Sequence, residues 1–261
     1  MRKVLVPTDF SETSLNAATY ATKLMTGIYG VNLLLYHVYE KPVHAAAAED
    51  ELKKLKTSLF DIGIVKTQVL SEQGDDFAAC LEEYVRENKP DLIIMGITGK
   101  SKIAQTLIGS NTLNIVKKNV CPVLIVPPAA KFTRLKNIAL ASDFIHAPSL
   151  AIAGVIKNML SDHFARLHIV NVNPTHHVSI TEAYEKVRNE MDTLFKGYEH
   201  EFHFIGLYDL PETLNMFVKD HNIDMIITLP RDHSWPGTLL GQSNTKKMGY
   251  QSSVPVLAIH Q

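Results

Sequence analysis

Cysteine is scarce in this chain of 261 residues, which has only Cys80 and Cys121. Cys80 is predicted inside a helix and Cys121 just before a strand. This arrangement argues against a disulfide scaffold and against a thiolate metal cluster, both of which need several cysteines at short spacings. We expect both residues to be small core side chains.

A strong charge of either sign is also absent, because 26 basic residues face 27 acidic ones and leave a formal net charge of -1. A nearly neutral chain has no general attraction for nucleic acid or for anionic lipid. No stretch approaches the roughly 18 consecutive apolar residues of a membrane span, and the apolar run at the start is too short for a signal peptide. We therefore expect a cytoplasmic protein that binds neither nucleic acid nor membrane.

Two familiar phosphate-binding motifs are missing as well. The chain contains neither G-x-x-x-x-G-K-[ST], the P-loop pattern, nor a G-x-G-x-x-G pattern after the first predicted strand. If the protein binds a nucleotide, it must therefore use a different loop from those of the P-loop and dinucleotide-binding folds.

The chain does contain an internal repeat. Val4–Phe10 resembles Ile138–Phe144 at an offset of 134 residues, and Asp91–Ile94 resembles Asp224–Ile227 at an offset of 133. A nearly constant offset from the start to the end of the repeat indicates that a whole domain has been duplicated. With 46% hydrophobic residues, each copy has enough apolar material for a packed core.

The predicted boundary is Lys131, after a run of prolines and alanines, and it gives domains 1–131 and 132–261. Short apolar runs alternate with longer amphipathic segments in each half, the pattern of a doubly wound α/β domain with a five-stranded parallel sheet. The strands predicted in the first half are residues 3–8, 31–38, 64–70, 91–95 and 122–126. Those predicted in the second half are residues 136–141, 165–171, 200–206, 224–228 and 255–259.

A glycine-rich segment follows the fourth predicted strand. Residues 96–110 have the skeleton G-x-x-G-x9-G-S. Glycines let a backbone turn tightly and approach a ligand, so that N–H groups can point at phosphate oxygens. Ser110 is predicted to begin a helix, whose free N–H groups and positive dipole end favour an anion. The segment also lies beyond the carboxyl end of a central strand, where open α/β sheets bind ligands.

The end of the first predicted strand faces the same crevice. Asp9 follows that strand directly, and either Asp9 or Ser11 is suited to cap the next helix. Capping and ligand contact are therefore both open for Asp9.

These segments together resemble a known family. Val6–Asp9, Leu35–Val38, the glycine-rich segment and Cys121–Val126 are similar to the universal stress proteins of the ATP-binding subclass, and the similarity spans residues 1–127. It implies a Rossmann-like fold of the adenine nucleotide alpha-hydrolase type. It also implies that ATP or another adenine nucleotide binds, together with Mg²⁺ or Mn²⁺.

The resemblance implies that Asp9 and Val38 hold the adenosine part of the ligand, and that the glycines and Ser110 wrap the ribose and phosphates. Lys100 would add positive charge or be merely solvated, and Asn111 and Thr112 would contact the phosphates or the metal or else cap the helix. The complete predicted set is Pro7, Thr8, Asp9, Val38, Gly96, Gly99, Lys100, Gly109, Ser110, Asn111 and Thr112.

The second half has lost this loop. Its counterparts of Gly96, Gly99 and Gly109 are Leu229, Asp232 and Gln242. Each replacement adds a side chain where the backbone must approach phosphate, and the aspartate adds a repelling charge. We therefore predict ATP in the first domain only.

The predicted function is that of a nucleotide-dependent module in stress response or regulation. No catalytic group stands out, so an enzyme is not expected, although slow ATP hydrolysis, self-phosphorylation and a purely structural scaffold remain as alternatives. The family resemblance also implies pairing through the last strands, 122–126 and 255–259, either within the chain or in a homodimer. A metal-binding or pH-sensing role of the histidines stays open, but surface or satisfied histidines are favoured because His200 and His203 fall on opposite faces of a strand.

Overall fold

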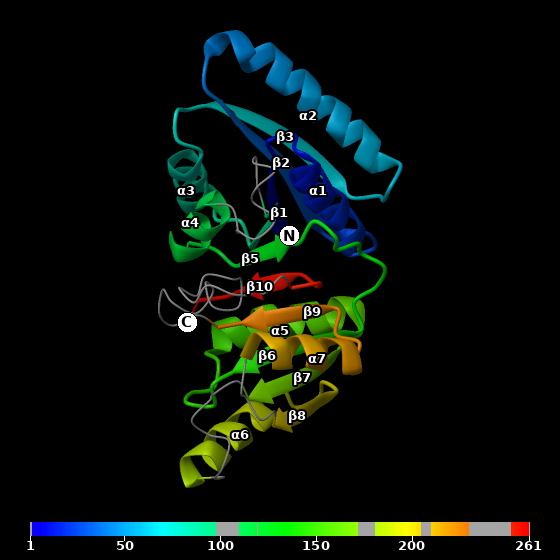
Figure 1. Ribbon diagram of the computed structural model, residues 1–261. Helices are drawn as coiled ribbons and strands as arrows, with labels where there is room; N and C mark the ends of the chain where they lie inside the picture. Colours follow the sequence, from blue (N-terminus) through cyan, green and yellow to red (C-terminus); the bar gives the residue numbers. More distant parts are fainter. Residues whose placement is uncertain are drawn as a thin grey trace. The chain divides into compact units, whose positions relative to one another are not determined.

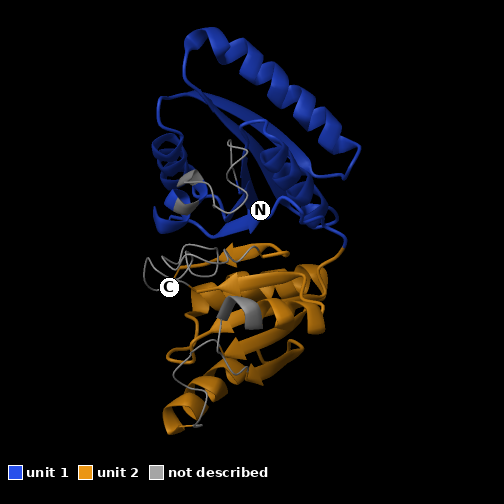
Figure 2. Ribbon diagram, viewed as in Figure 1, with its two compact units in different colours: residues 1–133 blue, residues 134–261 orange. Residues whose placement is uncertain are grey.

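The computed structural model describes residues 2–97, 110–118, 120–171, 181–204, 210–229 and 252–260. Its contacts divide the chain into two compact units, Met1–Thr133 and Arg134–Gln261 (Figure 2). The division falls close to Lys131, where the internal repeat places the join.

The first unit is a parallel sheet covered by helices. Its strands run in the order β3-β2-β1-β4-β5, and α1 contacts α2 while α3 contacts α4. Figure 1 labels the four helices of this unit and most of its strands. The elements in chain order are β1 (Arg2–Pro7), α1 (Glu12–Met25), β2 (Val31–Tyr39), the 3-10 turn η1 (Pro42–His44), α2 (Ala45–Phe60), β3 (Lys66–Gln73), α3 (Phe77–Asn88), β4 (Leu92–Gly96), α4 (Ser110–Lys118) and β5 (Val123–Val126).

The second unit repeats this topology with the order β10-β9-β6-β7-β8. Its elements are β6 (Asn137–Ser142), α5 (Leu150–His163), β7 (Arg166–Asn171), α6 (Glu182–Leu194), β8 (His200–Phe204), α7 (Leu210–Asp220), β9 (Met225–Thr228) and β10 (Val256–Ala258). Each of the ten predicted strands is found, with small shifts at the ends. The predicted fold class, two doubly wound five-stranded domains in tandem, is confirmed.

The two cores follow from the apolar periodicity. Every residue of β4 and of β5 is buried, as expected for strands with helices on both faces. On α2, the predicted stripe of Leu52, Leu55 and Leu59 is buried together with Ala48, and most of the other residues of that helix are exposed. Among the described residues, no helix combines the length and the apolar character that crossing a membrane requires.

The last strands, β5 and β10, each stand at the end of the strand order of their own unit. Pairing through residues 122–126 and 255–259 therefore stays a prediction for both the intrachain and the homodimeric arrangement.

Several helices begin at a side-chain cap, and Asp76 at the start of α3 is a well-formed case. Its Oδ1 accepts hydrogen bonds from the backbone N–H groups of Ala78 at 2.8 Å and Ala79 at 3.1 Å. A carboxylate at this position also meets the positive end of the helix dipole. The cap therefore contributes to the stability of the first unit.

Asp76→Ala is expected to lower the free energy of unfolding of the first unit by about 1 kcal/mol, because two N–H groups lose their acceptor. Urea unfolding followed by circular dichroism measures the change. Asp75→Ala is the matched control, since the neighbouring aspartate is exposed and is not the cap of α3. Equal losses in the two variants would contradict a specific role of the cap.

Candidate functional site

The candidate site lies where the carboxyl ends of β1, β2 and β4 meet. Within the sheet, β2 and β3 lie on one side of β1, and the chain then returns to form β4 on the other side of β1. The gap between the loops that follow β1 and β4 is therefore the topological switch point, where open α/β sheets bind ligands. The fold brings Asp9, Val38 and Gly96 to this edge.

Thr8 is a structural residue of the turn after β1. It is buried, its N–H donates to the carbonyl oxygen of Tyr36 at 2.8 Å, and its Oγ1 accepts from the N–H of Phe10 at 3.1 Å. Its hydroxyl also lies 3.1 Å from Ser14 Oγ, which donates its own proton to the carbonyl of Ser11. The hydroxyl of Thr8 therefore donates to Ser14, and its bonding capacity is used within the protein.

Asp9 supports the helix cap without being the cap. Ser11 is the N-cap of α1, where its Oγ accepts from the N–H of Ser14. The Oδ1 atom of Asp9 accepts from the N–H of Ser11 at 3.1 Å and from its Oγ at 2.5 Å. The carboxylate of Asp9 is only partly buried, at the end of a central strand. Capping by Ser11 leaves ligand contact open for Asp9.

The ends of β1 and β2 are held together by His37. Its Nδ1 lies 2.8 Å from the carbonyl oxygen of Thr8, which can only accept, so Nδ1 carries the proton. The His37 ring also packs against Phe10 at a centroid distance of 4.6 Å. Pro7 pairs with Tyr36, and Asp9 and Val38 each follow that pair by two residues. The two residues predicted to hold adenosine therefore follow neighbouring strands at the same edge of the sheet.

Gly96 has a packing role that the motif alone does not reveal. A Cβ atom at this position would lie 2.5 Å from the carbonyl oxygen of Thr13, in the first turn of α1. Glycine is therefore required for α1 to pack closely against β4. The carbonyl of Gly96 accepts a hydrogen bond from Thr112 Oγ1 at 3.1 Å, and Thr112 is fully buried. This bond favours the structural alternative for Thr112 over contact with phosphate.

The rest of the predicted loop is outside the described residues. Gly99, Lys100 and Gly109 belong to this group. For Ser110 and Asn111 only the helical backbone is described, and Ser110 is the first residue of α4, as predicted. The phosphate part of the site therefore stays a prediction from the sequence.

Burial favours the protonated form of both cysteines and of Tyr36 on β2. Burial raises the pKa of the Cys121 thiol to about 12, and its Sγ donates to the carbonyl of Pro90. Burial also raises the pKa of Cys80. For Tyr36, burial and then the hydrogen bond to Glu72, 2.6 Å long, raise the pKa. These three groups are therefore not nucleophiles near neutral pH.

The second unit keeps the turn after its first strand. The N–H of Phe144 donates to Ser142 Oγ at 3.2 Å, as that of Phe10 does to Thr8, and both phenylalanines have positive φ angles of 56° and 60°. Here, however, aromatic rings cover the strand ends: Tyr184 stacks on Phe144 at 4.6 Å. Asp232 and Gln242, the counterparts of Gly99 and Gly109, lie outside the described residues.

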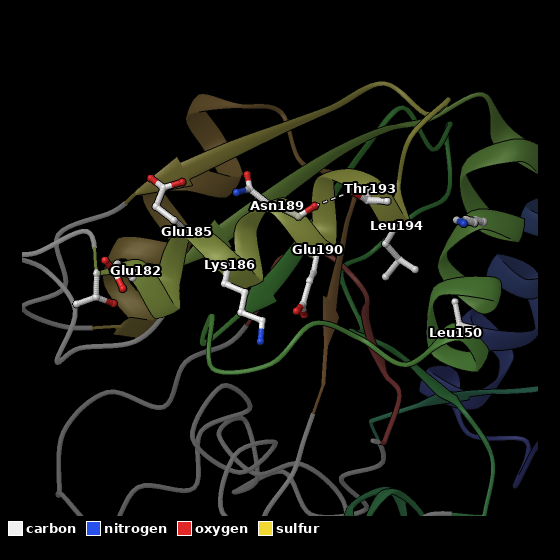
Figure 3. A pocket seen from close by; sticks show the side chains of 10 residues that line it. Leu150, Glu182, Glu185, Lys186, Asn189, Glu190, Thr193 and Leu194 are labelled. Atoms are coloured by element: carbon white, nitrogen blue, oxygen red, sulfur yellow. Dashed lines mark hydrogen bonds between the residues drawn. The ribbon is translucent and has the colours of Figure 1, made fainter.

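A pocket of about 1010 Å³ lies in the second unit, along α5 and α6 (Figure 3). Its lining mixes three glutamates with two lysines and apolar groups, so that its charge favours neither an anion nor a cation. The lining residues are Leu150, Lys157, Thr181, Glu182, Glu185, Lys186, Asn189, Glu190, Thr193 and Leu194. The switch point of the first unit remains the stronger candidate site, because its groups converge from several strand ends.

Comparison with known proteins gives consistent matches. The profile of the universal stress protein family matches residues 1–127. A universal stress protein of Methanocaldococcus jannaschii is 30% identical over 146 residues, which cover 50% of this chain and 84% of the relative.

Two solved structures match over both units. A universal stress protein from Archaeoglobus fulgidus has a TM-score of 0.73 and 21% identity, and the match covers 99% of this chain and 98% of the other. A protein of unknown function from Pseudomonas aeruginosa has a TM-score of 0.64 and 15% identity, and the match covers 100% of this chain and 92% of the other. At these identities the likeness concerns the fold.

Proposed function

Since this chain belongs to the universal stress protein family, we propose that its first unit binds ATP and that the chain acts as a nucleotide-dependent regulatory module in the cytoplasm. The observation that carries the proposal is the meeting of Asp9, Val38 and Gly96 at the switch point of the first sheet. Ligands of open α/β sheets bind at such a point.

The proposed roles follow the chemistry of each group. Asp9 and Val38, at the carboxyl ends of the neighbouring strands β1 and β2, hold the adenosine part. The N–H groups of the glycine-rich segment 97–109 and the start of α4 receive the phosphates, because free N–H groups and the helix dipole favour an anion there. Mg²⁺ or Mn²⁺ accompanies the phosphates and offsets their charge.

Regulation fits the described part of the site better than turnover does. Phosphoryl transfer to water needs a group that positions the attacking oxygen. We assign no such group among the described residues: His37 donates its Nδ1 proton to the carbonyl of Thr8 and packs its ring against Phe10, which holds the ends of β1 and β2 together. We propose that ATP is held rather than consumed, and that the second unit is a degenerate copy without ATP.

Isothermal titration calorimetry with ATP and Mg²⁺ tests the proposal. We expect one ATP per native chain and at least a tenfold loss of affinity in Gly109→Lys, because a long side chain fills the space that the backbone must leave for phosphate. Gln242→Lys, at the corresponding position of the second half, is the matched control and should bind like the native chain. Circular dichroism verifies that both variants are folded.

Three results would count against the proposal. Absence of ATP binding by the native chain would favour a structural scaffold. Two equivalents of ATP per chain would refute the assignment to the first unit alone. Multiple turnovers of ATP that are lost in Gly109→Lys would identify an ATPase instead of a binding module.

A further inference from the structure

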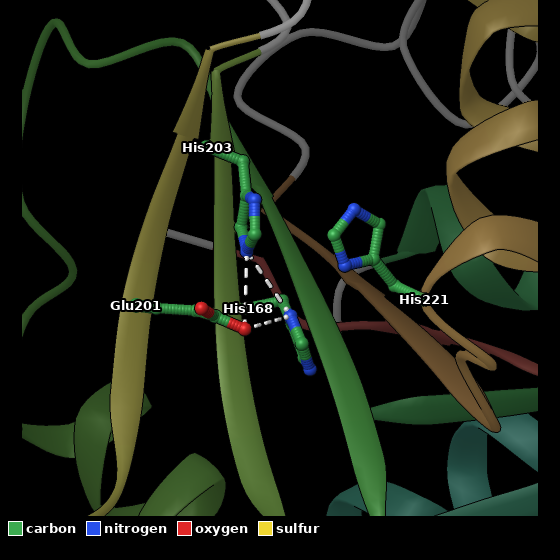
Figure 4. Close-up of side chains that lie close together, drawn as sticks. All are labelled: His168, Glu201, His203 and His221. Carbon is green, nitrogen blue, oxygen red and sulfur yellow. Dashed lines mark hydrogen bonds and ion pairs between the residues drawn. The ribbon is translucent and has the colours of Figure 1, made fainter.

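Four metal-ligating side chains converge in the second unit (Figure 4). His168 comes from β7, Glu201 and His203 come from β8, and His221 follows α7 directly. One nitrogen or oxygen atom from each residue lies within 4.8 Å of those of all the others.

The sheet register places these residues on one face. Glu201 and His203 are two positions apart on β8 and therefore point to the same side of the sheet. His168 on β7 pairs directly with Glu201, which puts its side chain on that side too. His221 is added from the turn after α7, where its N–H donates to the carbonyl of Phe217 at 3.0 Å. The side chain of His200, on the same strand, points to the opposite face.

The distances match the edges of a small tetrahedron. His168 Nδ1 lies 2.9 Å from Glu201 Oε1 and 3.1 Å from His203 Nε2, and the last two atoms are 3.5 Å apart. Zn²⁺ binds nitrogen and oxygen at about 2.0–2.1 Å, which in tetrahedral geometry separates neighbouring ligand atoms by about 3.3 Å. Three ligand atoms are thus already spaced close to what zinc requires, and His221 offers a ligand nitrogen within 4.8 Å of each of them.

A neighbouring asparagine lies beside the other ring nitrogen of His168. Asn137 Nδ2 donates to the carbonyl of Asn222 at 3.2 Å, so the amide oxygen Oδ1 is the atom that faces His168. That oxygen lies 3.4 Å from His168 Nε2 and can only accept, so it can receive a hydrogen bond from Nε2 when Nδ1 binds a metal ion. Nδ1 is the nitrogen that faces Glu201 Oε1, at 2.9 Å.

A proton or a metal ion must lie between these two atoms, because a nitrogen lone pair and a carboxylate oxygen repel one another at 2.9 Å. Histidine binds metals through an unprotonated ring nitrogen. A metal ion can therefore replace the proton between His168 and Glu201 and bind both atoms.

We propose that His168, Glu201, His203 and His221 bind one zinc ion. Imidazole suits zinc, whereas Mg²⁺ and Ca²⁺ prefer sites built from oxygen alone. Four protein ligands close the coordination shell, as in structural zinc sites. A histidine that binds zinc usually donates its other ring N–H to an oxygen, and Asn137 Oδ1 offers such an acceptor to His168. The ion joins β7, β8 and the turn between α7 and β9, so it stabilises the second unit.

The packing around the cluster supports a rigid site. The ring of Phe217 stacks on His221 at 4.2 Å and lies edge-on to His203 at 4.8 Å. His168 is 3% exposed. These contacts restrict the rotamers of the ligands before any ion arrives, which reduces the cost of ordering them on binding.

The test uses the full chain, stripped of metal with a chelator and kept free of nucleotide. Titration calorimetry with Zn²⁺ should show one site per chain, and added Zn²⁺ should raise the unfolding temperature of the native protein. Substitution with Co²⁺ should give the intense visible absorption of tetrahedral coordination. His203→Ala and His221→Ala should each weaken Zn²⁺ binding by at least tenfold and lose the Co²⁺ spectrum.

His200→Ala is the matched control. His200 lies on the same strand but points the other way, with its Nε2 3.2 Å from Asp192 Oδ1. This variant should bind Zn²⁺ and Co²⁺ like the native chain. His221→Gln provides a second ligand variant if His221→Ala fails to fold, since the amide keeps much of the volume of the ring.

Several outcomes would overturn the proposal. These are a native chain that binds no Zn²⁺, a weak Co²⁺ spectrum of octahedral type, and His200→Ala weakening the site as much as His203→Ala does. Folded His203→Ala and His221→Gln that both keep native Zn²⁺ affinity would overturn it as well. ATP is absent from every assay, so these results do not depend on nucleotide binding by the first unit.

Discussion

Asp9→Ala is expected to weaken ATP binding about 30-fold, which corresponds to about 2 kcal/mol. The carboxylate follows the central strand β1, whose neighbour β2 carries Val38. Its Oδ1 accepts hydrogen bonds from the N–H and the hydroxyl of Ser11 and so supports the turn. The alanine side chain removes both the charged acceptor proposed to contact adenosine and the support of the turn. Calorimetry with ATP measures the loss of affinity.

Two further variants separate these effects. Asp143→Ala removes the corresponding aspartate of the second unit, whose Oδ1 accepts from the N–H of Ile145 at 2.9 Å. If only the first unit binds ATP, Asp143→Ala binds ATP like the native chain. Asp9→Asn keeps an oxygen that Ser11 can use and removes the charge, so it should retain the turn while losing part of the affinity. Native affinity in both Asp9 variants would eliminate Asp9 as a ligand.

Gly96→Ala is expected to destabilise the first unit by about 3 kcal/mol, at the upper end of the usual cost of overpacking. The new Cβ would lie 2.5 Å from the carbonyl oxygen of Thr13, and a backbone atom cannot move aside as the end of a flexible side chain can. The first turn of α1 must shift, and Asp9 and Ser11 shift with it. Urea unfolding measures the loss of stability, and calorimetry should show weaker ATP binding in the same variant.

Gly154→Ala is the control for the glycine itself. Gly154 lies inside α5, and a Cβ atom there meets nothing within 4 Å. Alanine favours a helix over glycine by about 1 kcal/mol, so this variant should stabilise the second unit. A Gly96→Ala variant as stable as the native protein would show that α1 can retreat from β4 without cost.

Much of the candidate site was predictable because it depends on where strands end, which the local sequence shows. Strand ends are visible as the points where apolar runs stop, and parallel strands bring their carboxyl ends to one edge. Asp9, Val38 and Gly96 therefore met as expected. The roles of Thr8 and Thr112 were not predictable, because a hydroxyl is engaged or available according to neighbours that are distant in sequence, such as the carbonyl of Gly96 for Thr112.

The sequence alone determined the duplication, the alternation of strands and helices, and the loss of the glycine loop in the second half. All three depend on residue type and spacing along the chain, and none of them depends on how the strands pair. Only the tertiary structure decided that Gly96 must leave room for the backbone carbonyl of Thr13. It also decided which metal-ligating side chains come together, namely His168, Glu201, His203 and His221. The physical reason is register: the alignment of β7 against β8 and the place where α7 ends arise from packing across the whole sheet, which no local pattern encodes.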